Sequence, residues 1–176
     1  NIDAFGVLAG YALETDTVYF DISAGWISNL TSSGAYSGYF DELDPAIDSW
    51  DDYTAGATVS AVVGIADFTL IGEYLTALDN DFLVAEDSEP AAWNVEVIYN
   101  FEMLAKAAAF AVAYEGTDEA AFLGLPETRM SGTVSVELAD GVSVALEYAH
   151  DEDYDAANGG TGESADAVTC LLALEF

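Results

Sequence analysis

A nonpolar or small residue stands at every second position through most of this chain. The clearest series cover residues 130–138, 142–148 and 168–176. Successive side chains of a β-strand point to opposite faces, so a period of two predicts strands with unlike faces. The pattern predicts about nine strands, at 5–13, 18–26, 53–66, 67–78, 92–101, 106–115, 129–138, 142–149 and 168–176.

One segment carries a competing signal. Residues 101–114 contain Glu, Met, Leu, Lys and many Ala residues, which favour a helix by propensity alone. We interpret 106–115 as a strand, because Ala108, Phe110 and Val112 continue the period of two. The fold class that follows is all-β, as an antiparallel up-and-down sheet.

The connections between these strands alternate in length. Short ones lie near 14–16, 65–67, 103–105 and 139–141, and long acidic ones near 28–52, 79–90, 117–127 and 151–165. Short turns at one rim and long polar loops at the other are typical of a transmembrane β-barrel. Residues 1–176 are therefore expected to form a single barrel domain or the C-terminal part of one.

The hairpin around residues 139–141 predicts a register. A three-residue loop in which Gly141 supplies a positive φ would join the two strands. Each apolar side chain then meets another apolar one, which makes the register self-consistent. The predicted pairs are Leu138–Val142, Glu137–Ser143, Thr133–Glu147 and Arg129–Asp151.

Charge and composition exclude several classes of protein. The 176 residues include 33 acidic and 2 basic side chains (Lys106 and Arg129), for a formal net charge of −31. The chain is nevertheless 52% hydrophobic, with ten Tyr, nine Phe and three Trp, which argues against a disordered acidic segment. Two cations cannot neutralise a row of phosphates, so no nucleic-acid partner is expected.

The inventory of reactive residues is short. Cys170 and His150 are the single cysteine and histidine, which leaves no internal disulfide, no structural zinc set and no Ser-His or Cys-His triad. We therefore expect no enzyme activity. The longest uninterrupted apolar run, 107–114, is far shorter than the ~20 residues of a transmembrane helix, so any membrane crossing is expected to use strands.

The two faces of the predicted strands differ in bulk. One carries Gly, Ala, Ser, Thr and scattered carboxylates, and the other carries the large apolar and aromatic side chains. Aromatic rings near both ends of the strands match the two interfaces of a bilayer, with outer-membrane lipid as the partner. The expected girdle residues are Trp26, Trp93, Tyr114 and Tyr148 towards the long loops, and Tyr11, Phe68, Phe101 and Phe176 towards the short turns.

Small inward side chains are expected to leave a water-filled lumen. Its candidate lining residues are Asp21, Glu73, Glu96, Glu137, Glu147 and Arg129. Carboxylates in a pore favour cations, although they could equally serve only to keep the wall hydrated. Arg129 could mark a constriction, or could form a surface ion pair with Asp151.

The acidic loop after residue 150 resembles the start of a calcium-binding loop. An EF-hand is rejected, because Ala156 stands where the sharp turn needs Gly and Gly162 where the last ligand should be Glu. Two hypotheses stay open: weak binding of calcium or magnesium at Asp151, Asp153 and Asp155, or a solvated acidic rim. No other cofactor is expected.

The strand count is odd. With about nine strands and the last one ending at the short-turn rim, the first must begin at the long-loop rim. Single-chain bacterial barrels usually have an even number of strands with both ends on the short-turn side. We therefore expect further strands before Asn1, or closure with other subunits, and hence a wider barrel.

Several segments resemble a known family. LIGEYLTALD (70–79), AWNVEVIYNFE (92–102), AYEGTDEAAFLGLPETR (113–129), SVELADGVSVALEYAHDEDYD (135–155) and GGTGESADAVT (159–169) are similar to LbtU-type siderophore porins of the Gram-negative outer membrane. The resemblance covers the last 110 residues or so, and implies siderophore-linked iron uptake. Phe176 also resembles the terminal aromatic residue that is read by the barrel-assembly machinery. The resemblance transfers no ligand-binding residue.

These observations predict an outer-membrane porin or uptake channel with an acidic lumen. Two alternatives stay open. One is a structural or adhesive surface barrel that conducts nothing, and the other is a soluble acidic β-protein of a halophile.

Overall fold

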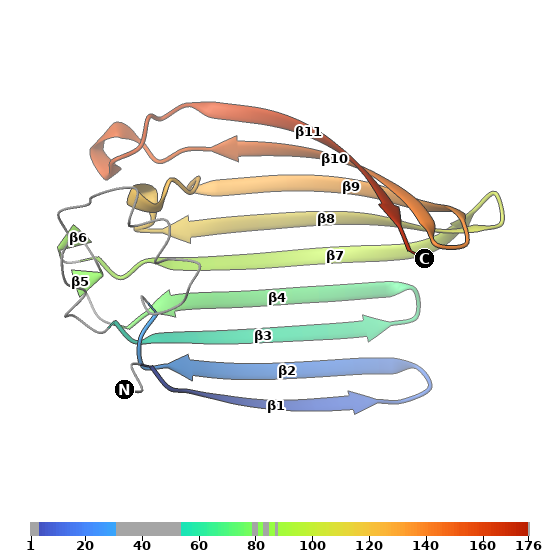
Figure 1. Ribbon diagram of the computed structural model, residues 1–176, viewed down its shortest axis with the longest axis horizontal. Helices are drawn as coiled ribbons and strands as arrows, with labels where there is room; N and C mark the ends of the chain where they lie inside the picture. The colour runs from blue at the N-terminus through green and yellow to red at the C-terminus, as the bar shows by residue number, and fades with distance from the viewer. Residues whose placement is uncertain (1–3, 31–53, 79–80, 83–84, 87, 176) are drawn as a thin grey trace.

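The computed structural model describes residues 4–30, 54–78, 81–82, 85–86 and 88–175 of the chain. These residues form one large antiparallel sheet with the strand order β1-β2-β3-β4-β7-β8-β9-β10-β11 (Figure 1). Each strand pairs with the long strand before it and the one after it, so the sheet is an up-and-down meander. The bounds are β1 Gly6–Glu14, β2 Val18–Ile27, β3 Gly56–Ile65, β4 Phe68–Ala77, β7 Ala91–Met103, β8 Lys106–Asp118, β9 Thr128–Ala139, β10 Val142–Glu152 and β11 Ser164–Leu174.

The nine predicted strands are confirmed. The segment with helical composition covers the end of β7, a tight turn and most of β8, which lies between β7 and β9. Its small and apolar side chains alternate in register with those of both neighbours, and this tertiary pairing outweighs the helix propensity of Ala, Glu and Lys.

Short and long connections lie at opposite ends of the sheet (Figure 1). Two short strands, β5 (Asp81–Phe82) and β6 (Ala85–Glu86), pair within the connection 79–90, and 3-10 turns Ala121–Leu123 and Ala156–Asn158 lie in the next two. Most of the predicted loop 28–52 lies outside the described residues. The chain enters β1 at the long-connection end and leaves β11 at the short-turn end (Figure 1).

The register of the hairpin between β9 and β10 is confirmed except at its tip. Glu147 pairs with Thr133 and Asp151 pairs with Arg129, as predicted. The predicted pair Leu138–Val142 is wrong, because Val142 pairs with Ala139 and the register shifts before Ser143. The turn thus holds two residues rather than three. Gly141 has the expected positive φ, +72°, which favours glycine.

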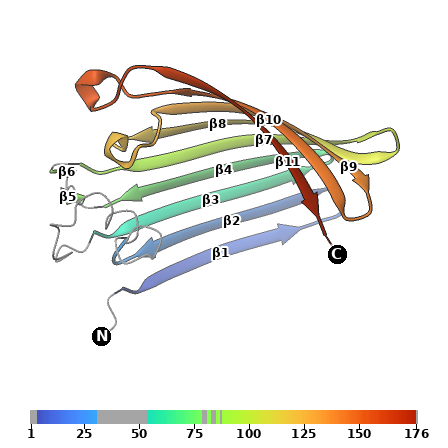
Figure 2. The ribbon, with the colours of Figure 1, turned by 45° about the horizontal axis from the view of Figure 1, so that its top comes forward.

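The sheet is open in the part of the chain that the structure describes. Its edge strands β1 and β11 each have one neighbour, and Figure 2 shows a single curved layer between them. Both edge strands run from the long-connection end to the short-turn end (Figure 1). The expectation of an all-β up-and-down sheet therefore holds, whereas closure into a barrel is not seen here.

No second layer covers the apolar side of the sheet among the described residues. Val97, Val134 and Leu146 remain 44%, 43% and 56% exposed. Among the described residues, the buried apolar side chains are those of Ala77, Ala108, Ala113 and Ala149 in the strands, and of Ala120 and Tyr154 in the connections. The core of a soluble domain of this size would contain many larger apolar side chains. The described residues also include no helix with the length and apolar character needed to cross a membrane.

Aromatic rings contact one another along this side. Trp93 and Tyr114 meet edge to face with centroids 5.1 Å apart, and Phe68 and Tyr99 lie 4.8 Å apart. Such pairs contribute about 0.5–1.5 kcal/mol beyond the burial of their area.

A glycine makes room for the Trp93 ring. A Cβ atom at Gly116, the cross-strand partner of Trp93, would lie 2.5 Å from the indole. We expect Gly116→Ala to destabilise the protein by about 1 kcal/mol, because the ring must leave its contact with Tyr114. Gly132→Ala is the matched control, since no atom lies within 4 Å of its added methyl. Thermal unfolding followed by tryptophan fluorescence tests this, and equal melting temperatures would contradict it.

Candidate functional site

The cross-strand register assigns every strand residue to one of two faces. We call the face that carries Val134, Leu146 and Trp93 the apolar face, and the face that carries Glu73, Asn94 and Glu147 the polar face. The predicted lining residues all lie on the polar face: Asp21, Glu73, Glu96, Glu137, Glu147 and Arg129.

The predicted girdle residues lie on the apolar face as far as the structure describes them. They are Trp26, Trp93, Tyr114 and Tyr148 near the long connections, and Tyr11, Phe68 and Phe101 near the short turns. Phe176 lies outside the described residues. Tyr74, Tyr99 and Phe110 share this face and were not predicted as girdle residues.

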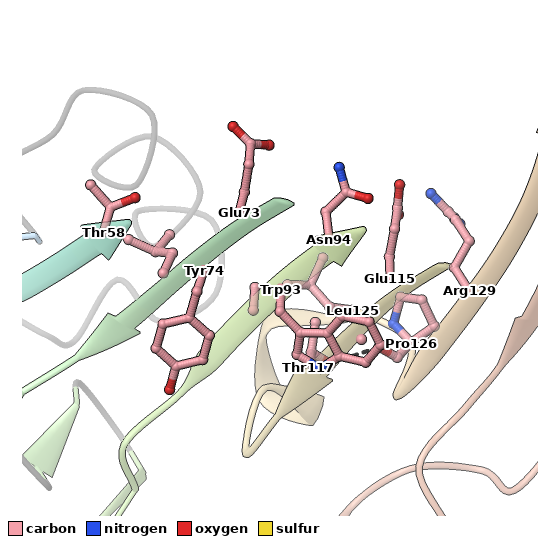
Figure 3. A pocket seen from close by; sticks show the side chains of 13 residues that line it. Thr58, Glu73, Tyr74, Trp93, Asn94, Glu115, Thr117, Leu125, Pro126 and Arg129 are labelled. Carbon is pink, nitrogen blue, oxygen red and sulfur yellow. Dashed lines mark hydrogen bonds between the residues drawn. The ribbon is translucent and has the colours of Figure 1, made fainter. Parts of the chain in front are cut away.

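Five polar residues form a continuous row across β4, β7, β8, β9 and β10. Each pairs directly with the next, in the order Glu73, Asn94, Glu115, Arg129 and Asp151. Figure 3 shows the first four pointing to the same side of the sheet, opposite to Tyr74. We call this set the polar row. The sequence analysis found Glu73, Arg129 and Asp151 but missed Asn94 and Glu115.

An ion pair ends the polar row. Arg129 donates from Nε to Asp151 Oδ1 at 2.6 Å and from Nη2 to Oδ2 at 2.7 Å. The two side chains are 43% and 24% exposed. This bidentate geometry confirms the predicted pair and fixes the orientation of both groups.

A cavity of about 440 Å³ lies along the first four members of the polar row. Glu73, Asn94, Glu115 and Arg129 line it together with Thr58, Leu75 and Thr117, and Leu125 and Pro126 of the connection between β8 and β9 complete its wall. A second cavity of about 290 Å³ towards β1 shares Thr58 and Leu75 with it. The long-connection end of the polar face is thus hollowed over several strands.

Tyr154 ties two connections together beside this cavity. Its side chain is 5% exposed, and its hydroxyl lies 2.7 Å from Thr117 Oγ1 and 3.3 Å from the Ala120 nitrogen, which donates to it. Thr117 in turn donates to the Pro126 carbonyl at 2.6 Å. The connection 151–165 therefore helps to hold the segment that carries Leu125 and Pro126.

The three acidic residues proposed for divalent cations do not converge. Asp151 binds Arg129, whereas Asp155 accepts from the nitrogens of Ala157 and Asn158 and begins a 3-10 turn. Within the described ranges, no group of three or more His, Cys, Asp or Glu side chains could hold a metal ion. Binding of calcium or magnesium stays a prediction.

Asp153 organises its own loop. It accepts hydrogen bonds from the hydroxyl and backbone nitrogen of Thr161, at 2.6 and 2.7 Å, and from the nitrogen of Tyr154. These donors, above all the Thr161 hydroxyl, lower the pKa of the Asp153 carboxyl below its ordinary value. The carboxylate thus stabilises the loop at neutral pH, and this contribution is lost as the pH falls through that lowered pKa.

A second polar group lies on the apolar face and was missed by the sequence analysis. Asp166 accepts a hydrogen bond from the Tyr148 hydroxyl at 2.6 Å, and its Oδ1 lies 2.8 Å from His150 Nδ1. All three residues stand near the long-connection end of β10 and β11. These contacts do not test whether His150 takes part in catalysis. Its lack of a catalytic role therefore stays a prediction.

The remaining predicted lining residues are spread along the polar face rather than gathered. Glu147 accepts a hydrogen bond from Thr133 at 3.1 Å. Asp21 pairs with Val62, Glu96 with Ala113 and Glu137 with Ser143. They form a dispersed negative lining, whereas the cavity brings charged side chains, an amide and an apolar wall together.

Comparison with known proteins gives one informative match. The chain is 31% identical over 163 residues to a UPF0422 protein of Coxiella burnetii. The alignment covers 86% of this chain and 33% of that protein, so the chain spans about a third of the length of the curated relative it matches. No family model matches the chain, and no solved structure matches it significantly.

Proposed function

We propose that this chain is part of an outer-membrane β-barrel that acts as a porin or uptake channel with an acidic lumen. The observation that carries the proposal is the contrast between the faces, which is clearest across β7, β8, β9 and β10. Most of the bulky side chains there are left bare on one face, and mostly small or polar side chains occupy the other. A bilayer outside and water inside satisfy both faces at once.

Closure requires further strands. Since β1 and β11 run in the same direction, joining them through antiparallel pairs alone takes an odd number of additional strands. An exposed edge of 9 to 11 residues is also a site of unwanted pairing, which native proteins cover. Other parts of a longer chain, such as the Coxiella relative has, or other subunits, could supply these strands.

The cargo belongs to the same proposal. The similarity to LbtU-type siderophore porins favours iron uptake. A lumen lined by Glu96, Glu137 and Glu147 would repel an anionic chelate, however, so a neutral or cationic cargo suits it better. Outer-membrane lipid and the barrel-assembly machinery would be the partners of such a protein.

Current measured across planar bilayers tests the channel. We expect the purified protein to give steady currents that favour potassium over chloride. The triple variant Glu96→Gln/Glu137→Gln/Glu147→Gln should lose most of this preference, because fixed carboxylates attract cations. Asp166→Asn, which removes one charge from the apolar face, is the control and should keep the preference.

Two results would contradict the proposal. Reconstituted protein that carries no current would favour the structural or adhesive barrel. Protein that stays monodisperse without detergent would favour the soluble acidic β-protein, since a bare apolar face of this size should aggregate in water.

A further inference from the structure

Three hydrogen-bond acceptors stand side by side in the polar row. Asn94 lies between Glu73 and Glu115, each its direct cross-strand partner, and such partners have Cβ atoms about 4.5–5.5 Å apart. The Asn94 Oδ1 atom is buried and has no hydrogen-bond partner. Buried acceptor atoms normally accept a hydrogen bond, so a ligand with a donor group would fit at this position.

The nearest cation is already engaged. Arg129 turns Nε and Nη2 to Asp151, on the side away from Asn94. Neither Glu73 nor Glu115 forms an ion pair among the residues that the structure describes. The cavity therefore presents two carboxylates with an unsatisfied amide oxygen between them, and the one cation in its wall, Arg129, attracts Glu115 while its hydrogen bonds go to Asp151.

The apolar part of the cavity wall suits an organic ligand better than a bare metal ion. Leu75, Leu125 and Pro126 line the same cavity, and its volume of about 440 Å³ is in the range of small-molecule sites. A ligand that fills it needs an apolar body as well as a charged head. An ammonium group carries three donors, which matches the three acceptors of the polar row.

We propose that this cavity binds an organic cation, with a primary ammonium group held by Glu73, Asn94 and Glu115 and an apolar body against Leu75, Leu125 and Pro126. The inference rests on the proposed function and names the class of its cargo. The ligand enters from the lumen and contacts the polar row at the long-connection end. The Tyr154 contacts that hold the segment 119–127 keep the apolar wall in place.

Isothermal titration calorimetry with 2-phenylethylammonium tests the proposal on the purified protein. We expect saturable binding, and affinity for the uncharged analogue 2-phenylethanol at least tenfold weaker. Glu73→Gln/Glu115→Gln should weaken ammonium binding at least tenfold, because two charge-assisted hydrogen bonds are lost. Glu14→Gln/Glu102→Gln is the matched control: it removes two carboxylates from the polar face outside the cavity and should change affinity by less than about twofold.

The outcomes separate the two proposals. Equal binding of the ammonium and the alcohol, no binding of either, or equal losses in both double variants would overturn the cation site. Conductance without binding would overturn the site and leave the channel standing. Binding without conductance, lost in Glu73→Gln/Glu115→Gln alone, would support the site and remove the channel.

Discussion

Leu146→Lys is expected to destabilise the protein in lipid bilayers by about 2–4 kcal/mol, the cost of a cation on the lipid face of a barrel near the midplane. Leu146 is 56% exposed, lies near the middle of β10 and pairs with Val134 and Cys170. An ammonium group at position 146 would have no charged cross-strand partner. The free energy of unfolding in vesicles, measured by urea titration, gives the difference.

The neighbouring residue provides the control. Ala145 is on the polar face, between Ser135 and Leu171, and Ala145→Lys places the same side chain towards the lumen. We expect its cost to stay below about 1 kcal/mol, since water and carboxylates surround it. Equal costs for the two lysines would show that the faces do not meet different solvents.

The second large effect is expected at Gly160. A Cβ atom there would collide with the Tyr154 carbonyl oxygen, which also accepts from the Gly162 nitrogen at 2.8 Å. Backbone must therefore move, and the Tyr154 hydroxyl would leave Thr117 and Ala120. We expect Gly160→Ala to cost about 2–3 kcal/mol, as the sum of a steric displacement and lost hydrogen bonds.

Hydrogen exchange locates this effect. In Gly160→Ala, amides of residues 117–127 should exchange faster, because Tyr154 no longer holds them. The added methyl of Gly132→Ala meets no atom within 4 Å. This variant should leave the exchange rates of these amides unchanged and the free energy of unfolding within about 0.5 kcal/mol of that of the unsubstituted protein. Unchanged protection of 117–127 in Gly160→Ala would refute the role of Tyr154.

Most of the sheet follows from local pattern. A period of two is visible within each strand, so the strands, their faces and the placement of Glu73 or Trp93 could be predicted. The short turn after β9 also fixed the register far enough to predict Arg129–Asp151. The tip of that hairpin was missed by one pair, because the register shifts by one residue between Val142 and Ser143, an irregularity that the alternation of side chains does not reveal.

Contacts across long connections could not be predicted. The pair His150–Asp166 requires the register of β10 with β11, and the connection after Glu152 is too long to fix it. The same holds for Leu125 and Tyr154, which reach the polar face from separate connections. Glu115 lies at the end of the predicted strand 106–115 and could have been found by following the register of that strand to Arg129.

The most direct test of the central claim uses Cys170, the exposed cysteine of the apolar face. A spin label on Cys170 in reconstituted vesicles should collide readily with oxygen, which concentrates in acyl chains, and rarely with a water-soluble nickel complex. A label on Leu171→Cys in a Cys170→Ser background, one residue along on the polar face, should show the reverse. Labels that meet the nickel complex equally at both positions, or a Cys170 label shielded from both reagents, would contradict a lipid-facing apolar side.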